Sequence, residues 1–228
     1  MPALVASDRP APGVALLTLI RPERRNALSV ALRDELCDHL ADLAADTGCK
    51  VVVITGAGPV FSSGFDLAEF ERATGDAEFA ERLWASADRY HHALAAFPLV
   101  TIAAINGPAI AGGFDLAVMC DLRVAASTAR FAHPEHAFGD VVYAPLRDLV
   151  GGGLARDLCF TGRELGADEA LAAHLVSAVV PPDHVVLQAL ELAGRVAAAP
   201  RDTILGNKAR VTARSRIVGT GPDGGLAL

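Results

Sequence analysis

The sequence lacks closely spaced cysteines, an excess of basic residues and any long apolar run, and each absence excludes a class of protein. The four cysteines among 228 residues form no Cys-x-x-Cys pair, so we interpret them as reduced core thiols of a cytosolic protein, with no metal site. Lys and Arg number 20 against 27 Asp and Glu. The resulting net charge of −7 argues against non-specific binding to nucleic acid or to an anionic membrane.

The N-terminus also lacks the basic and then apolar layout of a signal peptide, and no stretch has the length of a transmembrane helix. We therefore expect a cytoplasmic protein. Hydrophobic residues make up 52% of the chain and charged residues 21%, which is typical of a well-packed globular protein. The length allows one sizeable core, so a single domain over residues 1–228 is expected.

Strand and helix patterns alternate along the chain, which indicates the α/β class. Strands are expected over residues 14–20, 50–55, 102–105, 122–126, 129–132 and 175–180. Helices are expected after the N-cap residue Ser29, from Gly112, and over residues 77–97, 145–160, 167–173 and 183–199. Residues 1–13 are expected to be irregular at first, and residues 209–228 to begin as a helix and end as a glycine-rich tail.

Residues 102–121, IAAINGPAIAGGFDLAVMCD, combine a buried strand, a turn and a helix that begins with glycines. Free backbone N–H groups and the positive end of the helix dipole converge near Gly112, and Asp115 follows one turn later. This pattern predicts either a place that holds a developing negative charge or a tightly packed helix start in which Asp115 complements the dipole.

Three other patterns do not predict sites. Gly56 and Gly58 follow a strand, but Phe61 stands where a dinucleotide-binding loop has its third glycine. Ser62 and Ser63 are not in the Gly-x-Ser-x-Gly elbow of a serine hydrolase. Two adjacent histidines on the long helix lack a matching carboxylate, so a half-exposed helix face is favoured over a metal site.

Several motifs, in a fixed order, resemble the crotonase superfamily, whose founding member is enoyl-CoA hydratase. They cover most of residues 14–210 and are RPERRNALS, GAGPVFSSGFDL, TIAAINGPAIAGGFDLAVMCDLRVAA, RFAHPE, FTGRELGADEA and LVSAVV. The resemblance implies a crotonase-like spiral of ββα units with surrounding helices, assembled as a trimer or hexamer. It also implies an acyl-CoA thioester as partner, with coenzyme A as part of the substrate and no other cofactor.

By motif match, the resemblance implies an oxyanion hole made by the backbone N–H groups of Ser63 and Gly112. Such donors stabilise the oxygen of a thioester as it becomes an enolate. The two catalytic glutamates of hydratases correspond to Asp115 and Glu135. Asp115 is one methylene shorter, roughly 1.5 Å of reach. Glu135 alone could shuttle a proton between carbons, as in an enoyl-CoA isomerase.

The family binds CoA through the loop around RNAL and the loop that ends in SGFD. The positions implied for substrate or CoA contact are Arg25, Ala27, Ser63, Gly64, Phe65, Asp66 and Gly112. Arg24 or Arg25 is expected to meet a CoA phosphate, or else to be an ordinary surface charge. Asp66 is expected to hold its loop in place.

Two departures from the family pattern bear on the reaction. The segment after Glu135, GDVVYAPLRDLVGGG, is shorter than usual and predicts a reshaped acyl pocket. The C-terminal helical part, about residues 200–228, is also expected to be shortened. The leading hypothesis is an enoyl-CoA hydratase. The alternatives are an isomerase, or an enzyme of hydrolysis or decarboxylation, that uses Glu135 alone, and a non-catalytic acyl-CoA-binding protein.

Overall fold

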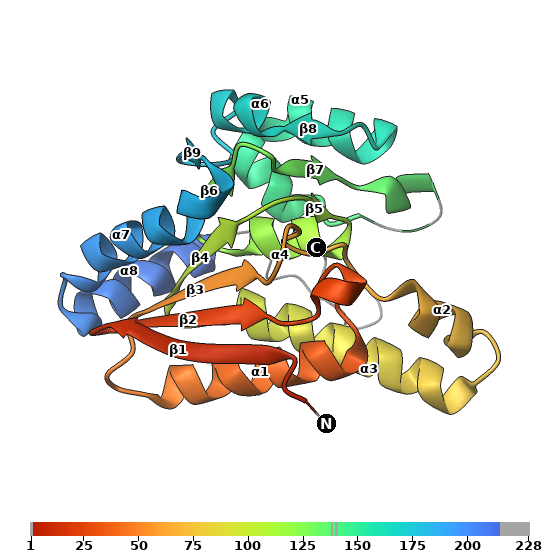
Figure 1. The fold of residues 1–228 in the computed structure, drawn as a ribbon, viewed down its shortest axis with the longest axis horizontal. Coiled ribbons are helices and arrows are strands. Elements are labelled where there is room, and N and C mark those ends of the chain that lie inside the picture. The colour runs from red at the N-terminus through yellow and green to blue at the C-terminus, as the bar shows by residue number, and fades with distance from the viewer. Residues whose placement is uncertain (1, 138, 140, 215–228) are drawn as a thin grey trace.

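The computed structural model describes residues 2–137, 139 and 141–214. These residues include a six-stranded sheet in which all neighbouring strands are parallel except the first pair (Figure 1). In spatial order the strands are β1 (Val5–Ala11), β2 (Val14–Leu19), β3 (Val51–Gly56), β4 (Val100–Ile105), β6 (Leu122–Ala126) and β9 (Val179–Val180). A second, three-stranded sheet contains β5 (Ala109–Ile110), β7 (Arg130–Ala132) and β8 (Leu165–Gly166).

Helices cover both faces of the large sheet (Figure 1). Val51 and Val53 of β3 pack on the side of α7 (Val185–Ala197), whereas Val52 and Ile54 belong to the main core on the other side. Because alternate strand residues point to opposite faces, a strand covered on both faces must be apolar throughout. The helices whose buried residues fill the main core include α1 (Val30–Ala45), α3 (Ala77–Ala95), α4 (Gly112–Met119) and α5 (Ala144–Thr161).

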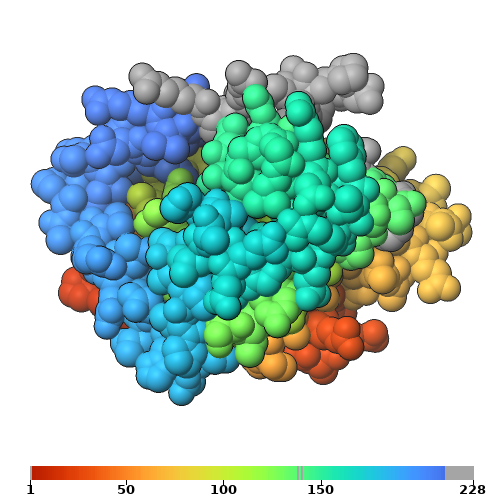
Figure 2. All heavy atoms as spheres, turned by 90° about the horizontal axis from the view of Figure 1, so that it is seen from above, coloured from red at the N-terminus to blue at the C-terminus, as the bar shows by residue number. Residues whose placement is uncertain are grey.

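The remaining helices lie at the edges of this framework. They are α2 (Leu67–Ala73), α6 (Ala167–Ala172) and α8 (Arg201–Arg214), with short 3₁₀ helices at Pro22–Arg24, Pro134–Ala137 and Pro182–His184. Seen from above, α5 and α6 cover a large part of one face, with α7 beside them (Figure 2). None of the helices in the described residues is both long and apolar enough to span a membrane.

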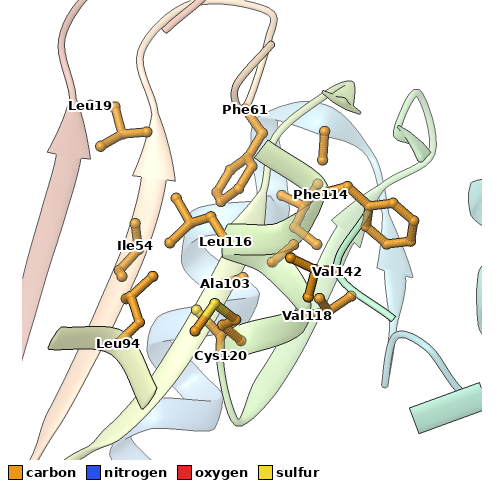
Figure 3. Packing of buried hydrophobic residues seen from close by; sticks show 14 of the residues in the cluster. Leu19, Ile54, Phe61, Leu94, Ala103, Phe114, Leu116, Val118, Cys120 and Val142 are labelled. Atoms are coloured by element: carbon orange, nitrogen blue, oxygen red, sulfur yellow. The ribbon is translucent and has the colours of Figure 1, made fainter. Parts of the chain in front are cut away.

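Helix α4 lies inside the core, and all eight of its residues are buried. Figure 3 shows its side chains directed both toward Ile54 and Ala103 of the large sheet and toward Val142 on the opposite side. A helix that is apolar all round must be enclosed in this way. The enclosure fixes the first turn of α4, and with it Gly112 and Asp115, relative to the strands.

The α/β class and most predicted elements agree with the structure. The N-cap role of Ser29 is confirmed, because its hydroxyl accepts the Leu32 N–H at 3.3 Å. The four cysteines lie within the described residues, and all are buried and free.

Three predictions about secondary structure need correction. The N-terminal segment is not irregular, because residues 5–11 pair with β2 as the edge strand β1. The strand expected over residues 175–180 shortens to Val179–Val180, because the N–H groups of Leu175 and Val176 donate to the Ala170 carbonyl of α6 and not to a neighbouring strand. Helix α2 was not expected. The predicted glycine-rich tail, and residues 215–228 of the C-terminal part, lie outside the described residues.

Candidate active site

The two glycine-containing motifs meet through backbone hydrogen bonds between their loops. The N–H of Phe61 donates to the Pro108 carbonyl at 3.1 Å, and the N–H of Ile110 donates to the Ser62 carbonyl at 3.0 Å. A side chain at Gly113 would overlap the Ser62 carbonyl, so only glycine allows the two backbones to approach this closely. The predicted convergence of the Ser-Gly-Phe-Asp loop with the start of α4 is therefore observed.

Two backbone N–H groups are available where these loops meet. The N–H of Gly112 belongs to the first turn of α4, where it has no partner within the helix. The N–H of Phe65 donates to no acceptor among the described residues. The two positions are adjacent: a Cβ built on Gly64 would lie 2.8 Å from the Gly112 nitrogen, and one built on Gly112 would lie 2.8 Å from the Phe65 ring.

Ala111, which directly precedes Gly112, has an unusual backbone conformation that orients the Gly112 N–H group. Its φ is +52°, a region that residues with a Cβ rarely occupy and that costs of the order of 1–3 kcal/mol. Its N–H donates to the Ala132 carbonyl at 2.9 Å, and its carbonyl accepts from Phe114 and Asp115. Three hydrogen bonds therefore hold the strained residue directly before Gly112.

Ser63, which the motif match predicts as the second oxyanion donor, is differently engaged. Its N–H donates to the Arg25 carbonyl at 3.0 Å. A donor that already has a partner within the fold is not free to receive a thioester oxygen. For this reason we replace Ser63 with Phe65 as the partner of Gly112 in the proposal below.

The predicted acids, Asp115 and Glu135, come together on a third residue, His133. The Nδ1 atom of His133 lies 2.9 Å from Oε1 of Glu135 and 3.7 Å from Oδ1 of Asp115. Asp115 comes from the first turn of α4, and Glu135 from the 3₁₀ helix after β7. His133 is fully buried and is not among the residues proposed from the sequence, although it stands inside the RFAHPE motif.

Burial determines the acidity of Asp115, which is 7% exposed. The pKa of its carboxyl rises from 3.8 to about 7, mainly because burial disfavours the charged form; His133 opposes this shift and Glu135 adds to it. Oδ1 of Asp115 and Oε2 of Glu135 are buried and have no hydrogen-bond partner among the described residues. Both carboxyl groups thus keep an oxygen free for water or for a substrate proton.

The same three side chains could offer a divalent cation one nitrogen and two carboxylate oxygens, all within 4.8 Å of one another. However, the contact between His133 and Glu135 has the length of a hydrogen bond. A proton already lies between these two atoms, so a cation would have to displace it.

The loop with the predicted CoA-binding residues is fixed by Asn26, which sequence reasoning missed. This fully buried side chain accepts the Arg21 N–H and donates to the Ala57 and Val60 carbonyls at 2.8–2.9 Å. Both Arg25 and Asn26 have a φ of +53°, a conformation that asparagine tolerates better than most residues. The ring of hydrogen bonds holds the loop against the segment before Ser63.

The other predicted CoA-binding residues are also brought together. The Leu28 N–H donates to the Gly64 carbonyl at 2.8 Å, which places the Ala27 backbone beside that loop. Arg25 is exposed. Asp66 pairs with Arg21 at 2.6 Å and accepts the Ala68 N–H at the start of α2, so it holds the loop as expected.

A comparison with known protein families identifies a match over residues 9–220 to the family described as enoyl-CoA hydratase/isomerase. A putative enoyl-CoA hydratase of Thermus thermophilus is 44% identical over 188 residues, which are 81% of this chain and 74% of the relative. A 2,3-dehydroadipyl-CoA hydratase of Escherichia coli is 40% identical over 191 residues, with 81% of this chain and 72% of the relative covered.

Solved structures of enoyl-CoA hydratases and isomerases are also similar to this chain. An enoyl-CoA hydratase from Bacillus anthracis has a TM-score of 0.86 at 31% identity, over 92% of this chain and 83% of that one. A monofunctional enoyl-CoA isomerase from M. smegmatis has a TM-score of 0.79 at 33% identity, over 95% of each chain.

Proposed function

The chain belongs to the enoyl-CoA hydratase/isomerase family, within the crotonase superfamily, and from this premise we propose that it adds water to a 2-enoyl-CoA thioester. One observation carries the choice: two carboxyl groups, those of Asp115 and Glu135, converge on the same buried histidine. Hydration needs one group that accepts a proton from water and a second that gives a proton to carbon. Moving a double bond needs only one group.

The thioester oxygen would be bound by the N–H groups of Phe65 and Gly112. As water adds to the β-carbon, the electron pair of the double bond moves toward the carbonyl and places negative charge on this oxygen. Fixed amide donors and the positive end of α4 stabilise that charge without reorganising. Losing one such donor costs about 3 kcal/mol in enzymes where it has been measured.

The carboxyl pair would handle both protons of the addition. The water O–H bond breaks toward an ionised carboxylate, and the resulting hydroxyl group bonds to the β-carbon. The other carboxyl, in its protonated form, gives its proton to the α-carbon and completes the saturated 3-hydroxyacyl product. An Asp115 carboxyl with a pKa of about 7 is protonated in a large fraction of molecules at neutral pH.

Coenzyme A would lie along the loops that contain Arg25, Ala27 and residues 63–66, with the exposed Arg25 guanidinium close to a phosphate. Coenzyme A is then part of the substrate, and the addition of water needs no redox cofactor. We further propose that the protein acts in the cytoplasm as a homotrimer or hexamer, without nucleic acid or membrane as partners. The resemblance to the family supports these finer assignments.

An isomerase that uses Glu135 alone is the second candidate. The M. smegmatis isomerase matches this chain over 95% of its length, and the short side chain of Asp115 reduces its reach toward a substrate. The short side chain of Asp115 is equally compatible with hydrolysis or decarboxylation of another acyl-CoA by Glu135 alone. A non-catalytic acyl-CoA-binding protein would also retain the backbone donors.

The decisive experiment supplies the purified protein with 2-enoyl-, 3-enoyl- and saturated acyl-CoA thioesters and follows each product, together with direct binding. We expect hydration of the 2-enoyl ester, and its loss in both Asp115→Asn and Glu135→Gln. Glu164→Gln, at an exposed residue paired with Arg130, is the matched control. Isomerisation that survives Asp115→Asn would favour the isomerase, and binding without turnover would favour the binding protein.

A further inference from the structure

His133 lies at the centre of the candidate site, yet proton transfer to and from substrate does not require it. Its side chain has no exposed surface, and its ring stacks on Phe114 with a centroid separation of 4.6 Å and an interplanar angle of 26°. The ring is therefore held in one plane, with Nδ1 directed toward both carboxyl groups.

The contact between His133 and Glu135 determines where a proton must be. An ionised carboxylate can only accept a hydrogen bond, so at 2.9 Å the proton lies on Nδ1 of His133 when Glu135 is charged. Hydrogen bonds to the charged form of a carboxyl group favour that form. The geometry thus holds Glu135 in the state that a general base requires.

Asp115 does not receive the same support. Its Oδ1 atom lies 3.7 Å from Nδ1 of His133, which is beyond hydrogen-bond length, and Oδ1 has no other partner among the described residues. A buried carboxyl without a donor favours its neutral form. Two chemically similar groups are therefore placed in different environments by one imidazole.

We propose that His133 is a positioning residue that divides the work of the two carboxyl groups: its Nδ1–H keeps Glu135 ionised to take a proton from water, and leaves Asp115 to carry the proton given to the α-carbon. The inference rests on the proposed hydration and assigns a role to each acid within it. Each turnover moves one proton from water to Glu135 and one from Asp115 to carbon, and the pair is reset when the proton on Glu135 returns to Asp115.

Other titratable groups near the pair do not supply a competing charge. On α5, burial raises the pKa of the Cys159 thiol to about 11. On α3, burial holds the pKa of Tyr90 well above 10. The ring of the neighbouring His136 lies against the His133 carbonyl, with its Nδ1 at 3.0 Å. The carboxyl groups that face the His133 ring in the described structure are those of Asp115 and Glu135.

Substitutions that imitate one ring nitrogen at a time test the proposal. The amide nitrogen of asparagine occupies the place of Nδ1, whereas that of glutamine occupies the place of Nε2. We expect His133→Asn to keep kcat within about fivefold of the parent, and His133→Gln and His133→Phe to lose about 10- to 100-fold, a range consistent with losing part of a general acid–base contribution. KM should change little in all three.

The pH dependence of kcat distinguishes a positioning role of His133 from a role in packing alone. His133 lowers the pKa of Asp115, so the limb of the kcat profile that reports Asp115 should move upward in His133→Phe but less in His133→Asn. His92→Gln, at an exposed histidine whose Nδ1 contacts the Asp88 carbonyl of its own helix, is the matched control and should leave kcat and its profile unchanged. Equal activity and equal profiles for the Asn and Gln variants would overturn the proposal.

Nitrogen NMR of the imidazole gives a readout that does not depend on turnover. We expect His133 in the intact protein to carry its proton on Nδ1, and the Nδ1 signal to change in Glu135→Gln. A neutral ring protonated only on Nε2 would overturn the proposal. If the intact protein hydrates no enoyl-CoA, the proposed function fails; if it does and the variants behave alike, only the role of His133 fails.

Discussion

The Nδ1 atom of His133 and the Oδ1 atom of Asp115 lie 3.7 Å apart in the core, close enough for their charges to interact but too far for a hydrogen bond. The pKa of Asp115 is raised to about 7 as a result of its burial. A carboxyl whose pKa is higher in the folded than in the unfolded chain binds its proton more tightly when folded. Its contribution to stability is therefore present at low pH and is lost as the pH rises from about 4 to about 7.

We expect Asp115→Asn to be more stable than the parent at pH 8, because it removes a carboxylate that is unfavourable when ionised and buried. A shift from 3.8 to about 7 corresponds to at most about 4 kcal/mol, and the gain should disappear below about pH 4, where both chains are neutral at this position. Urea unfolding at several pH values measures it. An Asn variant that is less stable than the parent at pH 8 would contradict this expectation. The same variant should lose hydration.

A substitution at Gly64 tests whether the backbone N–H groups of Phe65 and Gly112 bind the thioester oxygen. It has a φ of +84°, and a Cβ there would lie 2.8 Å from the Gly112 nitrogen. Gly64→Ala should displace the Phe65 and Gly112 N–H groups, and we expect kcat to fall by about 10²- to 10³-fold, the loss seen when one oxyanion donor is removed. Steady-state kinetics on the folded variant measures this.

Gly75→Ala is the control for that substitution, because a Cβ at Gly75 meets no atom within 4 Å. It should change neither kcat nor the melting temperature appreciably. If Gly64→Ala kept full activity while remaining folded, Phe65 and Gly112 would not be the donors.

The sequence predicted this site in part, and the physical reasons differ from residue to residue. Gly112 and the two acids could be proposed because glycine at a helix start and carboxyl groups in fixed motifs have recognisable chemistry. Ser63 was assigned by motif position alone, and its N–H proved to be engaged by the Arg25 carbonyl. A pairing between two loops cannot be read from either loop separately.

The edge of the fold was predicted less well than its centre for a similar reason. Central strands such as β3 are apolar throughout because both faces are covered. In contrast, β1 is mostly exposed after Val5, and its sequence contains Pro10. Its strand conformation comes from pairing with β2, which is a tertiary contact. His133 was overlooked because a single histidine has no periodicity, and only its distance to Glu135 shows its importance.

Asn26 should control substrate binding more than chemistry. Asn26→Asp would replace two N–H donors with an oxygen that faces the Ala57 and Val60 carbonyls. We expect a loss of stability of about 1–3 kcal/mol, the typical cost of leaving buried polar groups unpaired, and a several-fold increase in KM for the CoA thioester as its loop loosens. Chemical denaturation and kinetics measure the two effects. An unchanged KM would show that the loop does not contribute to CoA binding.

A largely buried ion pair joins helix α8 to Asp121, which lies between α4 and β6. The Nζ atom of Lys208 lies 2.7 Å from both carboxylate oxygens of Asp121, and the lysine side chain is only 7% exposed. Lys208→Met should destabilise the fold by about 3–5 kcal/mol, because it leaves the Asp121 carboxylate, which then has only the Thr101 N–H and hydroxyl as donors among the described residues, without a cation. The double variant with Asp121→Asn should recover part of this loss, since the uncompensated charge is then absent.

The control is Arg9→Met, which removes one member of an exposed ion pair with Asp46. It should cost less than about 1 kcal/mol. If both single variants cost the same, burial of the Lys208–Asp121 pair would not be what anchors α8.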